Sequence, residues 1–562
     1  MSRKGSLSSW GPVWVVFVVL FIHLYRLHFT PDPRVVAQAN SQYWVRVPVS
    51  TNRGAILDRN GIPLAVSVPA YSLFVDPKFW EPGQAVKLAG LLPPRTLSFL
   101  SSSLPGRFHW IARKISPDRS RPIQDLSLEG ISFLKEKKRI YPQEDLLSHV
   151  LGYCDVDDNG LAGIERNWDL ALYAPPQIRF LIRDAAGNLL TTIDDGVVTD
   201  DTPGSVVLTI DSRFQHVIER RLDEGVRSAG GKWGAAVCID PRTGDILASA
   251  SWPKYNPNIR ESFEPELLRN NVISRVYEPG STLKPIIVGF SLEEKWISPN
   301  EKFVGKGSIK IADAVISNVN KKAFGLETPE DILVNSCNVG MSQIGMRFDV
   351  YRAYETLRQW GLGVATGVEL PGEEIGLLRP PDQWRGVVPA NIAIGQGLAL
   401  TPLQLAQAYL PIANGGKLLR LHIVRRVADG RGAVIYESQR EVLRDVLAPA
   451  TAEWLRRVLR KVVAVGTGKA ASTSLADIAG KTGTAQVAEK GLYSENRYVA
   501  SFAGFWPWDD PQFVLLIVIG EPAGTMTYGG QIAAPIFRHI VEDMHYLHFA
   551  EEIQGGRSSE SD

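Results

Sequence analysis

Glu278-Pro-Gly-Ser-Thr-Leu-Lys-Pro285 is a turn that leads into the start of a helix. Pro285 has no N–H and is tolerated only within the first helical turn, so the helix must begin close to Ser281. Residues three apart on a helix share a face at a spacing of about 5–6 Å. The pattern therefore predicts that the Ser281 hydroxyl and the Lys284 amine meet near the positive end of the helix dipole.

This hydroxyl and this amine are a candidate nucleophile and base. A serine hydroxyl is a weak nucleophile, and a lysine can take its proton only if burial lowers the lysine pKa from about 10.4 towards neutrality. The spacing alone is a weak signal, because Ser132-Phe-Leu-Lys135 and Ser251-Trp-Pro-Lys254 repeat it in the same chain. An isolated match is compatible with an ordinary structural role, so the context has to decide between the three.

Two further patterns follow along the chain. Ser336-Cys-Asn338 comes directly after an apolar stretch, although Ser-x-Asn also fits three other places. Lys481-Thr-Gly483 occurs once and is followed by Thr484. A strand that carries a lysine, a hydroxyl and a glycine can hold a carboxylate, and Gly483 would let its backbone come close to a substrate. Taken singly, each of these patterns is also found at ordinary structural positions.

The apolar runs around these patterns have the lengths of β-strands. Residues 235–239 and 246–250 flank a Pro- and Gly-containing turn, which is typical of a hairpin. Residues 500–505 and 513–519 flank a second turn, which contains Pro507 and Pro511, shortly after the Lys481 pattern. We expect one antiparallel sheet to collect these four strands and a fifth at 481–486, with an α+β fold class and helices around the sheet at 215–227, 402–414 and 451–465.

The composition is that of a large globular protein and excludes some classes of function. At about 150 residues per domain, 562 residues correspond to three or four units. The 61 basic and 60 acidic residues give a formal charge of +1, which argues against binding to nucleic acid. Three scattered cysteines, Cys154, Cys238 and Cys337, fit neither a disulfide framework nor a metal site, so we expect buried free thiols.

An apolar segment begins at Trp10 and runs to Ile22 and on through Tyr25. It is slightly shorter than the ~20 residues that span a hydrocarbon layer of ~30 Å. We predict an uncleaved transmembrane signal-anchor. A cleaved signal peptide is the alternative, but the bulky residues 23–29 leave no small-x-small cleavage site. Basic residues on both sides leave the orientation open.

Residues 30–222 alternate short β-like runs with turns, which predicts a strand-rich first region.

The order of the three patterns resembles that of the penicilloyl-serine transferases, and specifically the class B penicillin-binding proteins, the monofunctional D,D-transpeptidases of cell-wall synthesis. The resemblance covers nearly the whole chain and includes further motifs at 53–61, 160–165, 240–244, 255–258, 395–397 and 528–530. It implies a penicilloyl-serine-transferase fold, in which an antiparallel five-stranded sheet carries helices on both faces. An elongated, strand-rich pedestal and a single N-terminal transmembrane helix would precede that fold.

The resemblance also implies a mechanism. Ser281 would attack the carbonyl of the penultimate D-Ala of a stem peptide, releasing the terminal D-Ala and leaving an acyl-enzyme. Lys284 would take the hydroxyl proton, and Ser336 would relay a proton to the leaving amine. Asn338 would hold the peptide amide and position Lys284. An amine from a neighbouring stem peptide would then resolve the acyl-enzyme.

The strand pattern would bind the donor peptide. By the same resemblance, Lys481, Thr482 and Thr484 would fix its terminal carboxylate, and Gly483 completes the motif. The backbone N–H groups of Ser281 and Thr484 would stabilise the developing oxyanion. β-Lactams, which mimic the D-Ala-D-Ala end, should acylate Ser281. No metal or organic cofactor is implied.

Partners and location follow from the resemblance as well. The substrates are peptidoglycan stem peptides, one as D-Ala-D-Ala donor and one as amine acceptor. The division branch works with a glycosyltransferase of the SEDS family and other divisome proteins. The catalytic part would lie outside the cytoplasmic membrane and the N-terminus inside. The implied division is a cytoplasmic tail at 1–9, an anchor at 10–29, a pedestal at 30–225, a transpeptidase domain at 226–548 and a disordered tail at 549–562.

Several alternatives remain open at this level. The motifs and the length favour the division branch, but an elongation-branch transpeptidase has the same three patterns. A D,D-carboxypeptidase, a β-lactamase or a β-lactam sensor also uses them, although the large pedestal argues against these. A catalytically inactive divisome scaffold is the non-enzymatic alternative.

Overall fold

The computed structural model describes residues 11–29, 32–34, 44–49, 53–106, 108–174, 177–183, 189–192, 202–489, 492–524 and 527–558. The chain forms two compact units, and each unit takes its residues from more than one stretch of the sequence. Unit 1 comes from residues 1–51, 69–137 and 175–201, and unit 2 from residues 52–68, 138–174 and 202–562. The predicted tail at 1–9, together with Trp10 and residues 559–562, lies outside the described residues.

Unit 1 combines two antiparallel ladders with short helices. One ladder has the order β1 (Trp44–Val49), β6 (Gln177–Arg183), β7 (Leu189–Thr192). In the other, the end of β3 (Pro63–Val75) pairs with β4 (His109–Ile115). A small core that includes Leu73, Leu88 and Leu100 lies between this ladder and three helices, η1 (Pro82–Leu88), α3 (Pro94–Leu100) and α4 (Pro117–Asp125). The predicted strands are present, and the helices were not foreseen.

Helix α1 spans Gly11–Phe29 and exposes most of its apolar side chains, among them Trp14, Phe17 and Phe21. Among the helices of the described residues, none combines the length and the apolar character that crossing a bilayer requires. In α1 the last two turns carry His23, Arg26 and His28, which interrupt the apolar run. The helix predicted at 10–29 is therefore present over Gly11–Phe29, but it does not combine the length and the apolar character of a membrane span.

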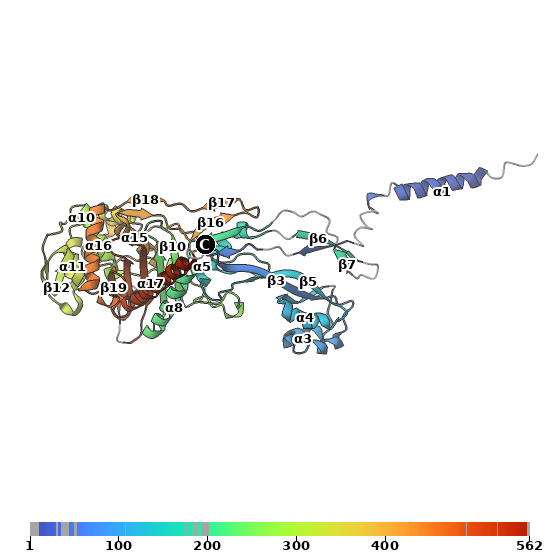
Figure 1. The fold of residues 1–562 in the computed structure, drawn as a ribbon, viewed down its shortest axis with the longest axis horizontal. Coiled ribbons are helices and arrows are strands. Elements are labelled where there is room, and N and C mark those ends of the chain that lie inside the picture. Colours follow the sequence, from blue (N-terminus) through green and yellow to red (C-terminus); the bar gives the residue numbers. More distant parts are fainter. Residues whose placement is uncertain are drawn as a thin grey trace, which may run out of the picture. The chain divides into compact units, whose positions relative to one another are not determined.

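Unit 2 is built on a five-stranded antiparallel sheet, which confirms the predicted grouping of the strands (Figure 1). The order is β10 (Ile246–Trp252), β9 (Trp233–Ile239), β21 (Phe513–Gly520), β20 (Leu492–Trp506), β19 (Ala479–Glu489). All seven residues of β9 are buried, because alternate side chains enter two different cores. A sheet that is covered on both faces needs such continuous apolar strands.

Helices cover both faces of this sheet, as the resemblance implied. Helices α8 (Ser212–Ala229) and α17 (Ala533–Ser558) pack on one face, and α15 (Pro402–Asn414) packs on the other (Figure 1). Helix α15 begins and ends where the sequence predicts: a capping box joins Thr401 and Gln404, and Gly415 closes the helix in the left-handed conformation. Helix α16 (Pro449–Ala464) corresponds to the helix predicted at 451–465.

The other elements of unit 2 connect this framework. Residues 63–68 of β3 and residues 138–140 of β5 (Ile131–Ile140) belong to it. Near them lie β2 (Ile56–Leu57), α5 (Ser148–Leu151), α6 (Gly163–Asn167), α7 (Asp169–Leu172) and β8 (Ser205–Leu208). The remainder is η2 (Arg260–Ser262), α9 (Asn271–Ser274), η3 (Gly280–Leu283), α10 (Lys284–Glu293), β11 (Phe303–Gly305), β12 (Ser308–Ile311), β13 (Ala314–Ser317), η4 (Val319–Lys321), β14 (Gly325–Glu327), α11 (Pro329–Asn335), α12 (Asn338–Gly345), α13 (Val350–Gln359), η5 (Pro381–Gln383), α14 (Val388–Ala393), β15 (Lys417–Leu419), β16 (Val424–Ala428), β17 (Val434–Glu437), β18 (Val442–Asp445) and η6 (Lys469–Ala471).

The C-terminus differs from the predicted disordered tail at 549–562. Helix α17 continues to Ser558 and takes in most of that stretch. Once a helix is formed, each added residue gains a backbone hydrogen bond at little further cost, and Ala550, Glu551 and Glu552 are good helix formers.

Two motifs quoted from the first part of the chain meet in a buried charge cluster of unit 2. Arg53 Nε lies 2.5 Å from one Glu165 oxygen, and Arg139 Nε lies 2.6 Å from the other. A third ion pair joins Arg53 to Asp169 at 2.7 Å. The Arg53 and Glu165 side chains are fully buried. Removal of one partner from such a cluster would leave an uncompensated buried charge, so the motif residues have a structural reason to occur together.

Candidate active site

Ser281 lies in the tight turn η3, directly before helix α10. Gly280 has a φ of 56°, in the left-handed region that favours glycine, and its N–H donates to Gly395 O at 2.9 Å. The Tyr409 hydroxyl donates to Thr282 O at 2.6 Å, from the middle of α15. Contacts on both sides of Ser281 therefore fix the turn, while Ser281 itself stays partly exposed.

Lys284 is fully buried, and its amine is held by three oxygen atoms. Its Nζ lies 2.8 Å from Ser336 O, 3.2 Å from Ser336 Oγ and 2.8 Å from Asn338 Oδ1. Among the described residues, no hydrogen bond joins Lys284 Nζ to Ser281 Oγ. The predicted direct contact between Ser281 and Lys284 is thus absent from this state, because these three oxygens already occupy the amine.

Ser336 brings a second lysine to the same place. It has a φ of 57° at the end of helix α11, an unusual conformation for a residue with a side chain. Its Oγ lies 3.0 Å from Lys481 Nζ and 3.2 Å from Lys284 Nζ. One hydroxyl therefore bridges the amines of two of the predicted patterns, and Asn338, from the same loop, completes the group.

The environment disfavours positive charge on both amines. Burial lowers the pKa of Lys284 to about 7, although Cys337 and Glu327 act in the opposite direction. Burial also lowers the pKa of Lys481 well below its usual range, and the neighbouring Lys284 lowers it further. A neutral amine at Lys284 can accept a proton near neutral pH, as a general base must.

Strand β19 carries the third pattern, Lys481-Thr-Gly483, and runs past the turn η3 that contains Ser281. A Cβ on Gly483 would lie 2.4 Å from Ser501 Oγ, 2.8 Å from Thr282 Cγ2 and 3.0 Å from Pro279 O. The sequence predicted that Gly483 leaves room for a substrate. The structure differs: the space beside Gly483 is filled by the protein's own turn around Ser281, so this glycine sets how closely β19 and η3 approach.

The two threonines of this pattern have partners that the sequence did not predict. Thr482 Oγ1 donates to Thr467 Oγ1 at 3.0 Å, and Lys481 Nζ lies 3.4 Å from the same hydroxyl. Thr484 Oγ1 accepts a hydrogen bond from Gly529 N at 2.9 Å, and this bond joins the 528–530 motif to strand β19. The only sequence signal for Thr467 is a hydroxyl between two glycines after a helix.

The two competing Ser-x-x-Lys matches are not helical. Ser132 and Lys135 lie in strand β5, and Ser251 lies in strand β10, two residues before the cis bond of Pro253. Residues three apart in a strand face opposite sides, so Ser132 and Lys135 cannot form a pair of the kind seen at the candidate site. Lys254 lies beyond the end of β10, where its amine contacts Asp145 and Glu219.

The three cysteines are free and buried, as predicted. Cys337 lies between Ser336 and Asn338, where its sulfur accepts from Gly340 N at 3.3 Å and caps helix α12. Burial raises the pKa of this thiol to about 11, so it stays protonated and unreactive. Its position in the motif has a structural explanation.

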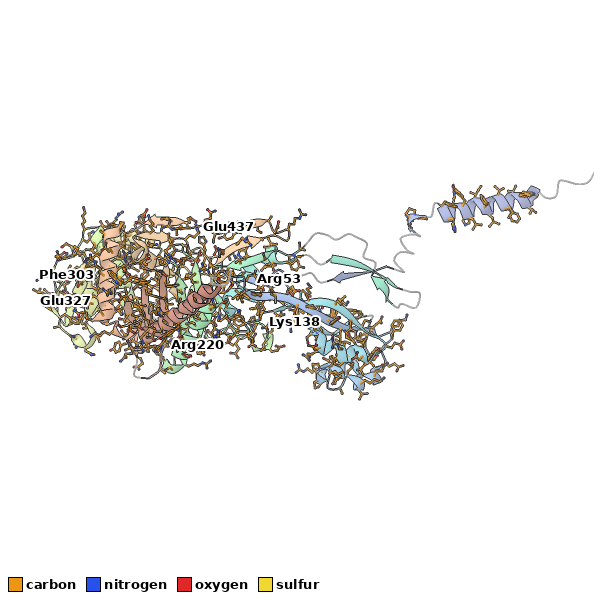
Figure 2. The ribbon with its side chains drawn as sticks, in the orientation of Figure 1. Arg53, Lys138, Arg220, Phe303, Glu327 and Glu437 are labelled. Atoms are coloured by element: carbon orange, nitrogen blue, oxygen red, sulfur yellow. The ribbon has the colours of Figure 1, made fainter. Side chains whose placement is uncertain are left out.

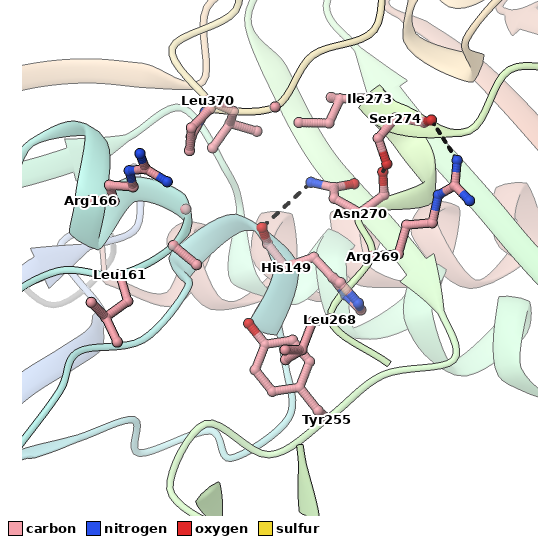
Figure 3. A pocket seen from close by; sticks show the side chains of 14 residues that line it. His149, Leu161, Arg166, Tyr255, Leu268, Arg269, Asn270, Ile273, Ser274 and Leu370 are labelled. Atoms are coloured by element: carbon pink, nitrogen blue, oxygen red, sulfur yellow. Dashed lines mark hydrogen bonds between the residues drawn. The ribbon is translucent and has the colours of Figure 1, made fainter. Parts of the chain in front are cut away.

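A cavity of about 270 Å³ lies elsewhere in unit 2, and its lining includes none of the predicted site residues (Figure 3). His149, Tyr255 and Asn270 are among the side chains that line it. Burial lowers the pKa of His149 to about 4, so this imidazole is neutral at pH 7, and it packs edge-on against Tyr255. The cavity contributes nothing to the chemistry of the two lysines.

Comparison with protein families finds two matches that together cover most of the chain. Residues 234–542 match the penicillin-binding protein transpeptidase domain. Residues 48–209 match the penicillin-binding protein dimerisation domain. All eight predicted site residues lie within the first match.

Similar proteins extend over nearly the whole length. The stage V sporulation protein D of Bacillus subtilis is 31% identical over 538 residues, which cover 94% of this chain and 83% of the relative. The peptidoglycan D,D-transpeptidase FtsI of Escherichia coli is 33% identical over 507 residues, 88% of this chain and 83% of the relative.

Solved structures agree with these relatives. The apo form of penicillin-binding protein 3 of Mycobacterium tuberculosis has a TM-score of 0.68 and 27% identity, covering 91% of this chain and 98% of that one. The same protein in complex with aztreonam matches with the same score and coverage.

Substitution of Gly483 tests the close approach of β19 and η3. We expect Gly483→Ala to lower stability by about 1–3 kcal/mol, as overpacking of a filled site does, and to slow the reaction of Ser281 with a fluorescent penicillin. Thermal unfolding and labelling rates measure the two effects. Gly83→Ala is the control, because a Cβ there meets no atom within 4 Å. Unchanged stability and labelling of Gly483→Ala would show that the turn and the strand are not in tight contact.

Proposed function

The chain belongs to the penicillin-binding proteins that carry a transpeptidase and a dimerisation domain, and from this membership we propose that it is a serine peptidoglycan D,D-transpeptidase of the division type. One observation carries the proposal: a fully buried lysine amine and a second lysine amine share the Ser336 hydroxyl, beside the turn that presents Ser281. The FtsI and sporulation relatives favour division over elongation.

The proposed reaction begins at Ser281. Its Oγ attacks the carbonyl of the penultimate D-Ala, and its proton passes to the neutral amine of Lys284, which has a pKa of about 7. The backbone N–H groups of Ser281 and Thr484 stabilise the oxyanion. A donor of this kind contributes about 10²- to 10³-fold in rate in other acyl-transfer enzymes. The turn η3 and the strand β19, which carry these two groups, are in contact at Gly280 and Thr484.

Ser336 is well placed for the second proton transfer. Because its hydroxyl contacts both amines, it can pass a proton from Lys284 to the leaving amine of the terminal D-Ala. Collapse of the tetrahedral intermediate then breaks the peptide bond and leaves an ester on Ser281. An amine of a second stem peptide attacks this ester, which forms the cross-link and frees the serine.

Lys481 and its neighbours bind the donor carboxylate in this proposal. A carboxylate beside Lys481 raises the pKa of that amine again, because an opposite charge favours the ammonium form. Thr482 and Thr484 add hydroxyl groups on the same strand. Asn338 holds the peptide amide and keeps Lys284 in place through its Oδ1 atom.

Labelling with a fluorescent penicillin tests the proposed nucleophile. We expect the wild type to be labelled on the peptide that contains Ser281, and Ser281→Ala to lose all label, because the other hydroxyl of the turn, Thr282 Oγ1, is buried and donates to Pro279 O. Ser132→Ala, which removes the serine of a competing match, is the matched control and should label normally. A folded wild type that takes no label would refute the proposal. Rapid turnover of a chromogenic cephalosporin would instead favour a hydrolytic relative.

The titration of Lys284 predicts the pH dependence of labelling. Since only the neutral amine accepts a proton, the second-order acylation rate should fall as the pH drops below about 7, by up to about tenfold for each pH unit. Stopped-flow labelling measures this rate, and circular dichroism checks that the protein remains folded. A rate that stays flat through this range would show that Lys284 is not the base.

We further propose that the apolar N-terminal segment attaches the chain to the cytoplasmic membrane, with the N-terminus inside and the chain after residue 29 outside. The exposed Trp14, Phe17 and Phe21 of α1 support attachment, and the location of peptidoglycan supports the orientation. A variant that lacks residues 1–29 should move from the membrane fraction to the soluble fraction and still bind penicillin. Retention in carbonate-washed membranes would contradict this. That a SEDS-family glycosyltransferase is a partner of this chain stays a prediction from the resemblance.

A further inference from the structure

Asn318 lies in an excursion of the chain between helices α10 and α11. The excursion contains two short antiparallel ribbons, β11–β14 and β12–β13, and the pairing of Phe303 with Glu327 closes its base (Figure 2). Asn318 follows β13 directly, and only 5% of its surface is exposed. None of the sequence patterns includes this residue.

The side chain of Asn318 uses all of its hydrogen-bonding groups. Its Nδ2 donates to Lys306 O at 2.9 Å and to Lys322 O at 2.8 Å, which ties the excursion together. Its Oδ1 accepts from Asn338 N at 2.8 Å and from Val339 N at 3.0 Å, the first two N–H groups of helix α12. The Cys337 thiol donates to the same oxygen at 3.5 Å.

These contacts fix the orientation of Asn338. Its backbone is held by Asn318, and its side-chain Nδ2 donates to Ser317 O at 3.0 Å. Because the NH₂ end of the amide is held by that carbonyl, the Oδ1 end must point the other way. It lies 2.8 Å from Lys284 Nζ.

We propose that Asn318 is a positioning residue for acylation, which acts by holding Asn338 so that its Oδ1 atom fixes the Lys284 amine beside Ser336. This inference rests on the proposed transpeptidase function and adds to it a residue outside the three motifs. Asn318 acts through Asn338 and is not itself close enough to bond the amine. Precise placement of a base is worth orders of magnitude in rate, so a small displacement of Asn338 should be measurable.

Acylation kinetics test this role. We expect Asn318→Ala to lower the limiting first-order rate of acylation by a fluorescent penicillin at least about tenfold, with little change in the non-covalent dissociation constant. Asn414→Ala is the matched control. Asn414 also donates from Nδ2 to two carbonyls, Pro241 O at 3.0 Å and Lys417 O at 2.9 Å, and accepts one backbone N–H. The acylation rate of Asn414→Ala should lie within about twofold of the wild-type rate, while its melting temperature falls about as much as that of Asn318→Ala.

A second variant separates positioning from folding. Asn318→Asp keeps the acceptor for helix α12, exchanges the Nδ2 donor for an oxygen, and adds a negative charge that only Asn338 separates from Lys284. The other charged or titratable neighbours of Lys284 are Lys481, Cys337 and Glu327. A carboxylate there favours the ammonium form, so the acid limb of the acylation pH profile should move to higher pH. If Asn318→Ala does not fold, the profile of Asn318→Asp decides the question.

The outcomes are distinct. Asn318→Ala that acylates as fast as Asn414→Ala, or Asn318→Asp with the wild-type pH profile, would overturn the positioning role. A folded wild type that takes no label would overturn the proposed function itself, whatever the variants do.

Discussion

The site depends on the burial of two lysine amines around one hydroxyl. In water both amines would be protonated, and neither could serve as a base at neutral pH. Removal from water disfavours the charged forms of both amines, and the neighbouring Lys284 further disfavours the charge on Lys481. The cost of holding Lys284 and Lys481 in this environment must be met by the fold, and the large core of unit 2 is the part of the chain that can meet it.

The members of the site come from different elements, and all but Lys481 lie at or beside the end of a helix. Ser281 lies in the turn before α10, Ser336 ends α11, Asn338 begins α12, and Lys481 lies within an inner stretch of β19. Helix ends and turns allow backbone conformations that helix interiors exclude, such as the positive φ of Ser336 and Gly280. The helices and the strand therefore hold the site rigidly, and the backbone conformations at the helix ends orient Ser281 and Ser336.

Close backbone approach is the second constraint on the site. Gly483, Gly280 and Gly395 pack where a Cβ would collide with, or lie at the limit of contact with, the neighbouring chain. This brings β19 next to the turn η3, so that Ser281 and Lys481 lie on neighbouring elements. The side chain of Asn318 adds a further constraint, because it joins the start of α12 to the excursion between β11 and β14.

The sequence by itself determined the α+β class, the five strands and the bounds of α15, and it singled out eight candidate site residues, because these depend on local periodicity and on short motifs. The spacing alone did not distinguish the three Ser-x-x-Lys matches, and the sequence did not show that the turn around Ser281 fills the space beside Gly483. It also missed Thr467 and Asn318, and it predicted a direct contact of Ser281 with Lys284 that the structure replaces with contacts to Ser336 and Asn338. Those features depend on residues that are distant in sequence and meet only after folding, and no local pattern records which oxygen a buried amine will reach.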